Sequence, residues 1–126
     1  MRRVELPSAF ARLRVGEEGG RIVSAIRLQT KKPWAIDIAY FTPVGRAIYL
    51  TGMVVDVAMQ GRGVGRAALA DAEAIVNAWP AGAIRLDAYD AEAGAGQFYV
   101  SCGYSERGRV VYRSNPLIYY ERLLAN

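Results

Sequence analysis

Apolar side chains recur at helical spacing between Gly65 and Trp79, and this is the most regular pattern in the chain. Their positions follow i, i+1, i+4, i+7, i+8 and i+11, which places them on one face of a helix. Pro80 and Gly82 come directly afterwards and end the predicted helix. The residues of this apolar face are Ala68, Leu69, Ala72, Ile75, Val76 and Trp79.

Apolar and β-branched runs that precede this helix predict strands. The segments Ala9–Val15 and Arg21–Gln29 flank Gly16–Gly20, which predicts a β-hairpin with a glycine-rich turn. A long strand is predicted over Ala47–Ala58. Gly52 interrupts it and indicates a bulge or a close backbone approach.

Two further strand patterns follow the helix. Ala83–Tyr89 is predicted to be a buried strand, and the order strand, helix, strand predicts a right-handed parallel βαβ unit. Near the C-terminal end of the chain, Val110–Tyr112 and Leu117–Tyr120 are separated by residues 113–116. This spacing predicts a closing hairpin.

Two segments have weaker patterns. Trp34–Phe41 is a short apolar segment between turn residues, and it predicts either a strand or an ordered loop. Asp90 can cap a second helix that runs to about Cys102. Gly94 and Gly96 lower the helix propensity of its first turns.

Length and composition indicate a single domain over residues 1–126, with 52% hydrophobic and 22% charged residues. No apolar run approaches the ~20 residues that a membrane span needs, and no secretion signal is recognisable, so we expect no membrane partner. The single cysteine, Cys102, suits a reducing compartment, and we expect a cytoplasmic protein. Without histidine, no metal site is expected.

The net charge of +4 and the pI near 9.5 favour an anionic partner. The basic residues are dispersed along the chain and form no basic run, which makes a nucleic acid an unlikely partner. A generally basic surface explains most of the arginines equally well.

A glycine-rich segment joins the long predicted strand to the predicted helix. Gly61, Gly63 and Gly65 leave backbone N–H groups uncovered by side chains, and the helix that follows adds the positive end of its dipole. The third glycine of a dinucleotide fingerprint would fall on Arg66, and the chain has no Gly-Lys pair for a P-loop. The segment therefore predicts an anion site of another class.

Two motifs resemble those of one family. Gln60-x-x-Gly63-x-Gly65 resembles the [R/Q]-x-x-G-x-[G/A] signature of the GCN5-related N-acetyltransferase (GNAT) superfamily. Phe98–Tyr104 resembles the Y-x-x-x-G-[F/Y] element of that family. A helix and a strand separate the two motifs, as in the family, and the resemblance covers about residues 10–124. The alternative is a glycine-rich turn that binds no ligand.

The resemblance implies an α/β (α+β) fold in which a mixed, mostly antiparallel sheet is flanked by helices. The hairpin over residues 10–29 resembles the second and third strands of the family. The first strand and the two helices after it are then absent or reduced to a stub in residues 1–8. Because those helices form one wall of the acceptor site in the family, that wall would come from residues 31–45, from a second subunit of a homodimer, or from nothing.

The resemblance also implies that the chain binds acetyl-CoA and transfers its acetyl group to an amine. The backbone N–H of Val55 would face the acetyl carbonyl, and Val57 would lie beside the pantetheine arm. The glycine loop would bind the pyrophosphate through consecutive N–H groups, with added positive charge from two arginines. The loop residues are Gln60, Gly61, Arg62, Gly63, Val64, Gly65 and Arg66.

Tyr99 matches the family tyrosine that acts as a general acid toward the CoA sulfur, and its ordinary pKa near 10 keeps it protonated at neutral pH. The alternative is a core tyrosine with a locally bonded hydroxyl. Glu92 stands where many members carry an asparagine that contacts the pantetheine.

The general base has no match in the sequence. Tyr49 and Thr51 occupy the strand positions where members carry a glutamate. Asp56, Glu92 and Asp37 remain candidates that would act through an ordered water. The absence of a base leaves a second interpretation open, a non-catalytic acyl-CoA-binding module of the same fold.

Overall fold

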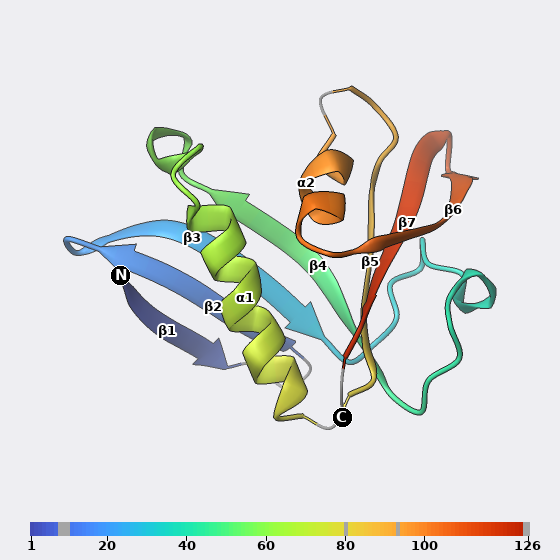
Figure 1. Ribbon diagram of the computed structural model, residues 1–126, viewed down its shortest axis with the longest axis horizontal. Helices are drawn as coiled ribbons and strands as arrows, with labels where there is room; N and C mark the ends of the chain where they lie inside the picture. The colour runs from blue at the N-terminus through green and yellow to red at the C-terminus, as the bar shows by residue number, and fades with distance from the viewer. Residues whose placement is uncertain (8–10, 80, 93, 125–126) are drawn as a thin grey trace.

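The computed structural model describes residues 1–7, 11–79, 81–92 and 94–124, and these form an open mixed sheet with two α-helices (Figure 1). The strand order in this part of the chain is β1-β2-β3-β4-β5-β7-β6. The strands are β1 (Arg2–Pro7), β2 (Ala11–Glu18), β3 (Arg21–Gln29), β4 (Ala47–Val55), β5 (Ala83–Tyr89), β6 (Ser105–Tyr112) and β7 (Asn115–Leu123). The helices are α1 (Val64–Asn77) and α2 (Gly96–Ser101), with short 3-10 helices η1 (Ile38–Tyr40) and η2 (Val57–Met59).

The predicted hairpins and the predicted βαβ unit are present. β2 pairs with β3, and β6 pairs with β7, both antiparallel. Gly19 and Gly20 have φ angles of 59° and 78°, the left-handed conformation that a tight hairpin turn requires. Residues 9 and 10 of the first predicted strand lie outside the described residues, as does the proline predicted to end α1.

α1 joins β4 to the parallel strand β5, and the two strands pair only over a short stretch. The register runs from Ala47↔Ala83 to Tyr49↔Arg85 and then stops. Beyond Tyr49 the strands diverge, as Figure 1 shows, and α2 lies over the opening. The sheet is therefore open between its two halves.

The predicted helix is confirmed as α1, and its apolar face packs on the sheet. Ala68, Leu69, Ala72 and Val76 are at most 4% exposed. They pack against buried residues of the strands on either side in one core. On the polar side of this contact, Arg14 of β2 donates two hydrogen bonds of 2.9 Å to the carboxylate of Asp71.

The second predicted helix is much shorter than expected. α2 begins at Gly96, and Asp90 caps no helix; its backbone N–H donates to Pro116 O at 3.0 Å instead. A Cβ on Gly94 would overlap with the carbonyl oxygen of Tyr89, so this segment makes a tight turn that only glycine fits. The low helix propensity of the glycines therefore decides where α2 begins.

The strand predicted over Ala47–Ala58 ends earlier, at Val55. The side chain of Asp56 accepts a hydrogen bond from Ala58 N and caps η2, which contains Val57. A register shift opposite Arg27 and Leu28 confirms the bulge expected near Gly52.

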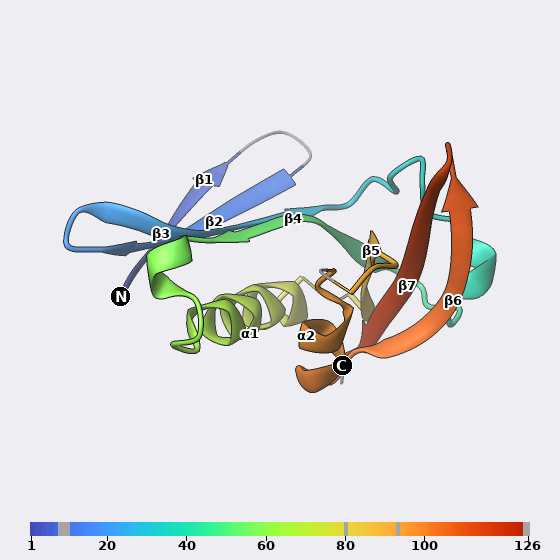
Figure 2. The ribbon, with the colours of Figure 1, turned by 90° about the horizontal axis from the view of Figure 1, so that it is seen from above.

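The shortened N-terminal region is confirmed, but its residues form a full strand. β1 pairs with β2 from Arg2↔Glu17 to Pro7↔Arg12. Only three residues separate β1 from β2, too few for the two helices that follow the first strand in the family. Figure 2 shows α1 and α2 on the same side of the sheet.

The segment between β3 and β4 covers the other side of the sheet near β5 and β7. Trp34–Phe41 forms the ordered loop of the two alternatives, with η1 inside it. Ile36 and Phe41 pack with Tyr49 and Tyr119 in a second, smaller core. We refer to residues 30–46 as the covering loop.

Glu121 of β7 holds the covering loop against the sheet by hydrogen bonds to Thr42. Its side chain is 3% exposed and accepts hydrogen bonds from both the backbone N–H, at 3.2 Å, and the hydroxyl of Thr42. Arg107 Nε lies 3.3 Å from the same carboxylate. A buried carboxylate is tolerated only with such partners.

We expect Glu121→Ala to destabilise the protein by about 3 kcal/mol, because it leaves the Thr42 amide and hydroxyl unpaired in a buried position. Urea unfolding measures the change. Glu106→Ala is the control, because Glu106 is exposed and its surface ion pair with Arg109 should contribute little to stability. Equal effects of the two substitutions would contradict the anchoring role of Glu121.

Candidate functional site

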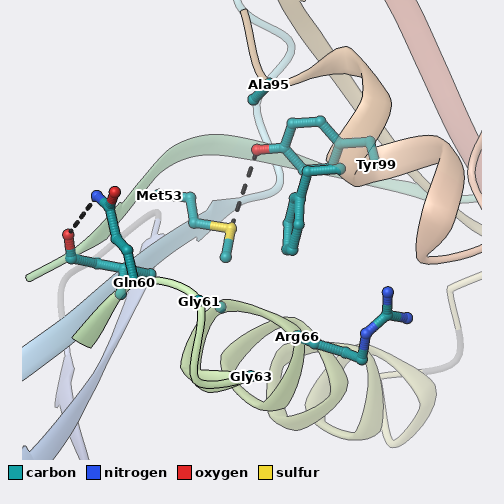
Figure 3. Close-up of a pocket in the computed structure, with 10 residues that line it drawn as sticks. Met53, Gln60, Gly61, Gly63, Arg66, Ala95 and Tyr99 are labelled. Carbon is teal, nitrogen blue, oxygen red and sulfur yellow. Dashed lines mark hydrogen bonds between the residues drawn. The ribbon is translucent and has the colours of Figure 1, made fainter. Parts of the chain in front are cut away.

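A cleft of about 630 Å³ lies between the end of β4, the glycine loop and α2 (Figure 3). It is the place where the two halves of the sheet separate and where the N-terminus of α1 points. Most of the predicted site residues meet here. The lining residues are Met53, Val55, Gln60, Gly61, Gly63, Gly65, Arg66, Ala95, Phe98 and Tyr99.

The glycine loop has the conformation of an anion cradle. Gly61 and Gly63 have φ angles of 78° and 76°, a backbone conformation that residues other than glycine rarely adopt. Within the described part of the chain, none of the backbone N–H groups from residue 61 to residue 66 donates a hydrogen bond to another residue. These amides are available to an anion at the N-terminus of a 14-residue helix.

The end of β4 offers further unpaired backbone. The N–H of Asp56 donates to Val23 O of β3 at 2.8 Å, and in a strand successive N–H groups point to opposite edges. The N–H of Val55 therefore points away from β3, toward the opening between β4 and β5. The side-chain amide of Gln60 donates to the carbonyl of Val55 at 3.4 Å and holds the loop against the strand end.

Met53 is a site residue that the sequence reasoning missed. It lies two residues before Val55 and lines the same cleft. The sequence offered one signal for Met53: in a strand, residues two positions apart lie on the same face, so Met53 shares the face of Val55. A Cβ on Gly65 would lie in ordinary contact with the Phe98 ring, at 3.4 Å, and with the methyl group of Met53, at 3.5 Å, so the start of α1 lies close to both.

Tyr99 of α2 closes the cleft with a buried ring. The side chain is 6% exposed, and its hydroxyl lies 3.9 Å from the sulfur of Met53. Its ring contacts Phe98 and Tyr104 edge-on, at centroid distances of 5.4 and 5.8 Å. Burial is the main reason that the pKa of Tyr99 rises to about 12, so the hydroxyl keeps its proton at neutral pH.

Four predicted site residues do not line the cleft. Val57 was expected in the strand and beside the pantetheine arm, but it lies in η2 and is 82% exposed. Arg62 lines a separate hollow with Arg21 and Met59. Val64 is buried at the start of α1, and Glu92 lines another hollow beside the turn between β5 and α2.

Arg66 borders the cleft but is already bonded within the protein. Its guanidinium donates to the backbone oxygen and the hydroxyl of Ser101, both at 3.1 Å. In Figure 3 its side chain points away from Tyr99 and Met53. Arg66 therefore joins the start of α1 to the end of α2.

The carboxylates proposed as bases lie away from the cleft. Asp56 pairs with Arg21, and this hydrogen bond is the main reason that its pKa is lowered. Asp37 caps η1 by accepting from Ala39 N at 3.0 Å. Glu92 lies in the other hollow.

Asp87 is a further carboxylate that the sequence reasoning missed, and it too is not among the residues that line the cleft. It lies on β5 two residues beyond the last pair with β4, so it borders the opening in the sheet. Burial raises its pKa. Burial is also the main reason that the pKa values of Tyr99 and Tyr119 are raised, and the charge of Asp87 adds a smaller contribution to each. An aspartate between the apolar residues Leu86 and Ala88 was the signal in the sequence.

The profile of the Acetyltransferase (GNAT) family matches residues 4–104. The chain belongs to this family. The described residues contain no cluster of three or more His, Cys, Asp or Glu side chains that could hold a metal ion. No helix among them is long and apolar enough to cross a membrane.

Solved structures share the GNAT fold with this chain at low sequence identity. A candidate streptothricin acetyltransferase from Bacillus anthracis, in complex with acetyl coenzyme A, is 18% identical, with a TM-score of 0.74 over 94% of this chain and 65% of that one. An aminoglycoside 6'-N-acetyltransferase complexed with coenzyme A is 12% identical, with a TM-score of 0.71 over 92% and 74%.

A ribosomal-protein-alanine N-acetyltransferase from Brucella melitensis is 18% identical, with a TM-score of 0.71 over 90% of this chain and 69% of that one. This chain therefore spans between 65% and 74% of these three structures. No curated protein sequence matches the chain.

Proposed function

We propose that this GNAT domain transfers the acetyl group of acetyl-CoA to an amine by direct attack. The observation that carries the proposal is the convergence of three kinds of donor on one cleft: the glycine-loop amides, the free N–H of Val55 and the protonated hydroxyl of Tyr99, whose partner is the weak acceptor sulfur of Met53. The first suits a pyrophosphate, the second a carbonyl oxygen, and the third a departing thiolate.

The donor half of the site fits acetyl-CoA on physical grounds. The glycines leave the pyrophosphate open access to the backbone, since no atom lies within 4 Å of a Cβ placed on Gly61 or Gly63. Arg62, which is exposed beside the loop, adds positive charge at long range. Bound acetyl-CoA supplies an activated thioester carbonyl and a thiolate leaving group.

Three groups of the protein share the proposed chemistry. The N–H of Val55 hydrogen-bonds the acetyl oxygen and stabilises the negative charge that develops there. Asp87 takes a proton from the incoming ammonium and leaves its nitrogen pair free to attack. Tyr99 protonates the sulfur as the carbon–sulfur bond breaks and regains a proton from the attacking nitrogen. An amide, a thiol and one released proton are the products.

A non-catalytic acyl-CoA-binding module is the alternative function for this fold. The missing N-terminal helices favour it, since they remove one wall of the acceptor site in the family. The covering loop supplies another wall, and Asp87 supplies a carboxylate. Catalysis is therefore the function that the geometry supports best, and turnover distinguishes the two.

We expect the protein to bind acetyl-CoA with micromolar affinity in calorimetry, and Gly63→Trp to weaken binding at least ~100-fold by filling the cradle and straining a left-handed position. Circular dichroism checks that the variant folds. Gly45→Trp is the control, because Gly45 is exposed, lies outside the cleft and has open space around it. A folded native protein that does not bind acetyl-CoA would refute both the catalytic and the binding-module interpretations.

Tyr99→Phe should lower kcat by roughly 10²-fold, the usual contribution of a positioned acid, and leave the Kd for acetyl-CoA nearly unchanged. The phenylalanine retains the ring contacts of α2. Tyr104→Phe removes a hydroxyl from the same buried cluster outside the cleft lining, so it should leave kcat near normal. If the two variants have the same turnover in a steady-state assay, Tyr99 is not the acid.

Asp87→Asn should lower kcat/KM by about 10²-fold and remove the acidic limb of its pH profile. The base must be deprotonated, and burial raises the pKa of Asp87, so native activity should rise with pH through that elevated pKa and then level off. Asp90→Asn is the control, since Asp90 contacts Arg109 at the surface. Retention of the acidic limb in Asp87→Asn would exclude Asp87 as the base.

A further inference from the structure

A second recess, on the opposite side of the sheet from α2, has an unusual composition. It measures about 430 Å³ and lies between the covering loop and the β6–β7 hairpin. We call it the loop-side recess. Its lining residues are Trp34, Ala35, Ile36, Asp37, Tyr40, Val110, Val111, Tyr112 and Tyr119. Figure 2 shows η1 beyond β6 and β7, away from α2.

The lining suits a cation that carries an apolar group. Aromatic rings and one carboxylate, that of Asp37, border the recess, and no basic side chain is among the described lining residues. Trp34 and Val111 of this lining are 84% and 75% exposed, so the recess presents apolar surface that a bound ligand would bury. Aromatic faces attract ammonium groups, and a nearby carboxylate adds to that attraction.

The recess is built by fixed contacts. A Cβ on Gly108 would overlap with the Tyr40 ring, so glycine at this position allows the ring to lie against β6. The Tyr40 ring meets Tyr119 edge-on at a centroid distance of 5.4 Å. The Tyr119 hydroxyl donates to Ala35 O and accepts from Asp37 N, which holds the loop over the recess. A preformed site loses less entropy when it binds a ligand.

The recess lies next to the opening in the sheet. Tyr119, at its floor, is the register partner of Asp87 on β5. Paired residues of neighbouring antiparallel strands project from the same face. Asp87 therefore lies on the recess side, and it also borders the gap that leads to Tyr99. An amine held in the recess would lie on the same face of the sheet as Asp87.

We propose that the loop-side recess is the acceptor site and that the acceptor is a primary ammonium attached to an aromatic or bulky apolar group. The rings of Trp34 and Tyr40 bind the apolar group and Asp37 attracts the ammonium. The ring of Tyr112 is already occupied by the guanidinium of Arg113, 5.3 Å from its centroid. The covering loop thus replaces the wall that the family builds from two helices. This inference rests on the proposed acetyl transfer for its role in catalysis.

The test measures binding apart from turnover. In calorimetry without acetyl-CoA, 2-phenylethylamine should bind the full chain at least ~10-fold more tightly than either butylamine or 2-phenylethanol, since each of these lacks one of the two recognised groups. Trp34→Ala and Asp37→Asn should each weaken that binding at least ~5-fold. Asparagine keeps an oxygen to cap η1, and alanine replaces a side chain that is mostly exposed.

Ile22→Ala is the control, because Ile22 is 58% exposed on β3, far along the sheet from the recess. With acetyl-CoA present, the Trp34 and Asp37 substitutions should raise KM for 2-phenylethylamine and leave kcat and the Kd of acetyl-CoA near native values. These results would establish the recess as the acceptor site.

Equal binding of the three compounds, or binding that Trp34→Ala and Asp37→Asn do not weaken, would overturn the recess proposal even if other amines are acetylated. Selective amine binding without acetyl-CoA binding would support the recess as an amine site and refute the proposed acetyl transfer. Amine binding thus tests the recess proposal, and acetyl-CoA binding tests the proposed acetyl transfer.

Discussion

The short pairing between β4 and β5 is the constraint on which the rest of the structure depends. Backbone hydrogen bonds join these strands only as far as Tyr49 and Arg85, and beyond this point each strand presents an edge to the gap. Unpaired backbone in a protein interior is costly unless a ligand or water satisfies it. The gap therefore exposes the Val55 N–H and gives both faces of the sheet access to the same place.

Two features keep the gap open while the domain stays folded. α1 packs its apolar face in one core with buried residues from both halves of the sheet, and Arg66 joins its first turn to Ser101 of α2. On the other face, Glu121 holds Thr42 and fixes the covering loop over β5 and β7. The two halves of the sheet are thus connected through helices and loop, which leaves the strand edges free for chemistry.

The absence of helices between β1 and β2 changes the acceptor side more than the donor side. The glycine loop, Val55 and Tyr99 all come from the part of the chain after β3. In the proposed site, the wall opposite them comes from the covering loop, whose residues Tyr40 and Phe41 pack on Tyr119. Under that proposal, a small GNAT domain keeps its donor cleft and acquires a different acceptor wall.

Local patterns in the sequence determined the elements with strong periodicity and the glycine cradle. The face of α1, the strand Ala83–Tyr89, both hairpins and the left-handed Gly63 follow from side-chain spacing and backbone sterics, which act over a few residues. The positions of Val57 and Glu92 outside the cleft did not follow, because a cap at Asp56 ends β4 and a turn at Gly94 delays α2.

Only the tertiary structure decided which distant residues share a site. Met53, Asp87 and the aromatic residues of the covering loop carry no motif, and their roles depend on which strands pair and where that pairing stops. The register of β5 with β7 sets Asp87 beside Tyr119, 32 positions away in the chain. Long-range pairing is fixed by packing of the whole sheet, and for that physical reason no short segment of this sequence could reveal it.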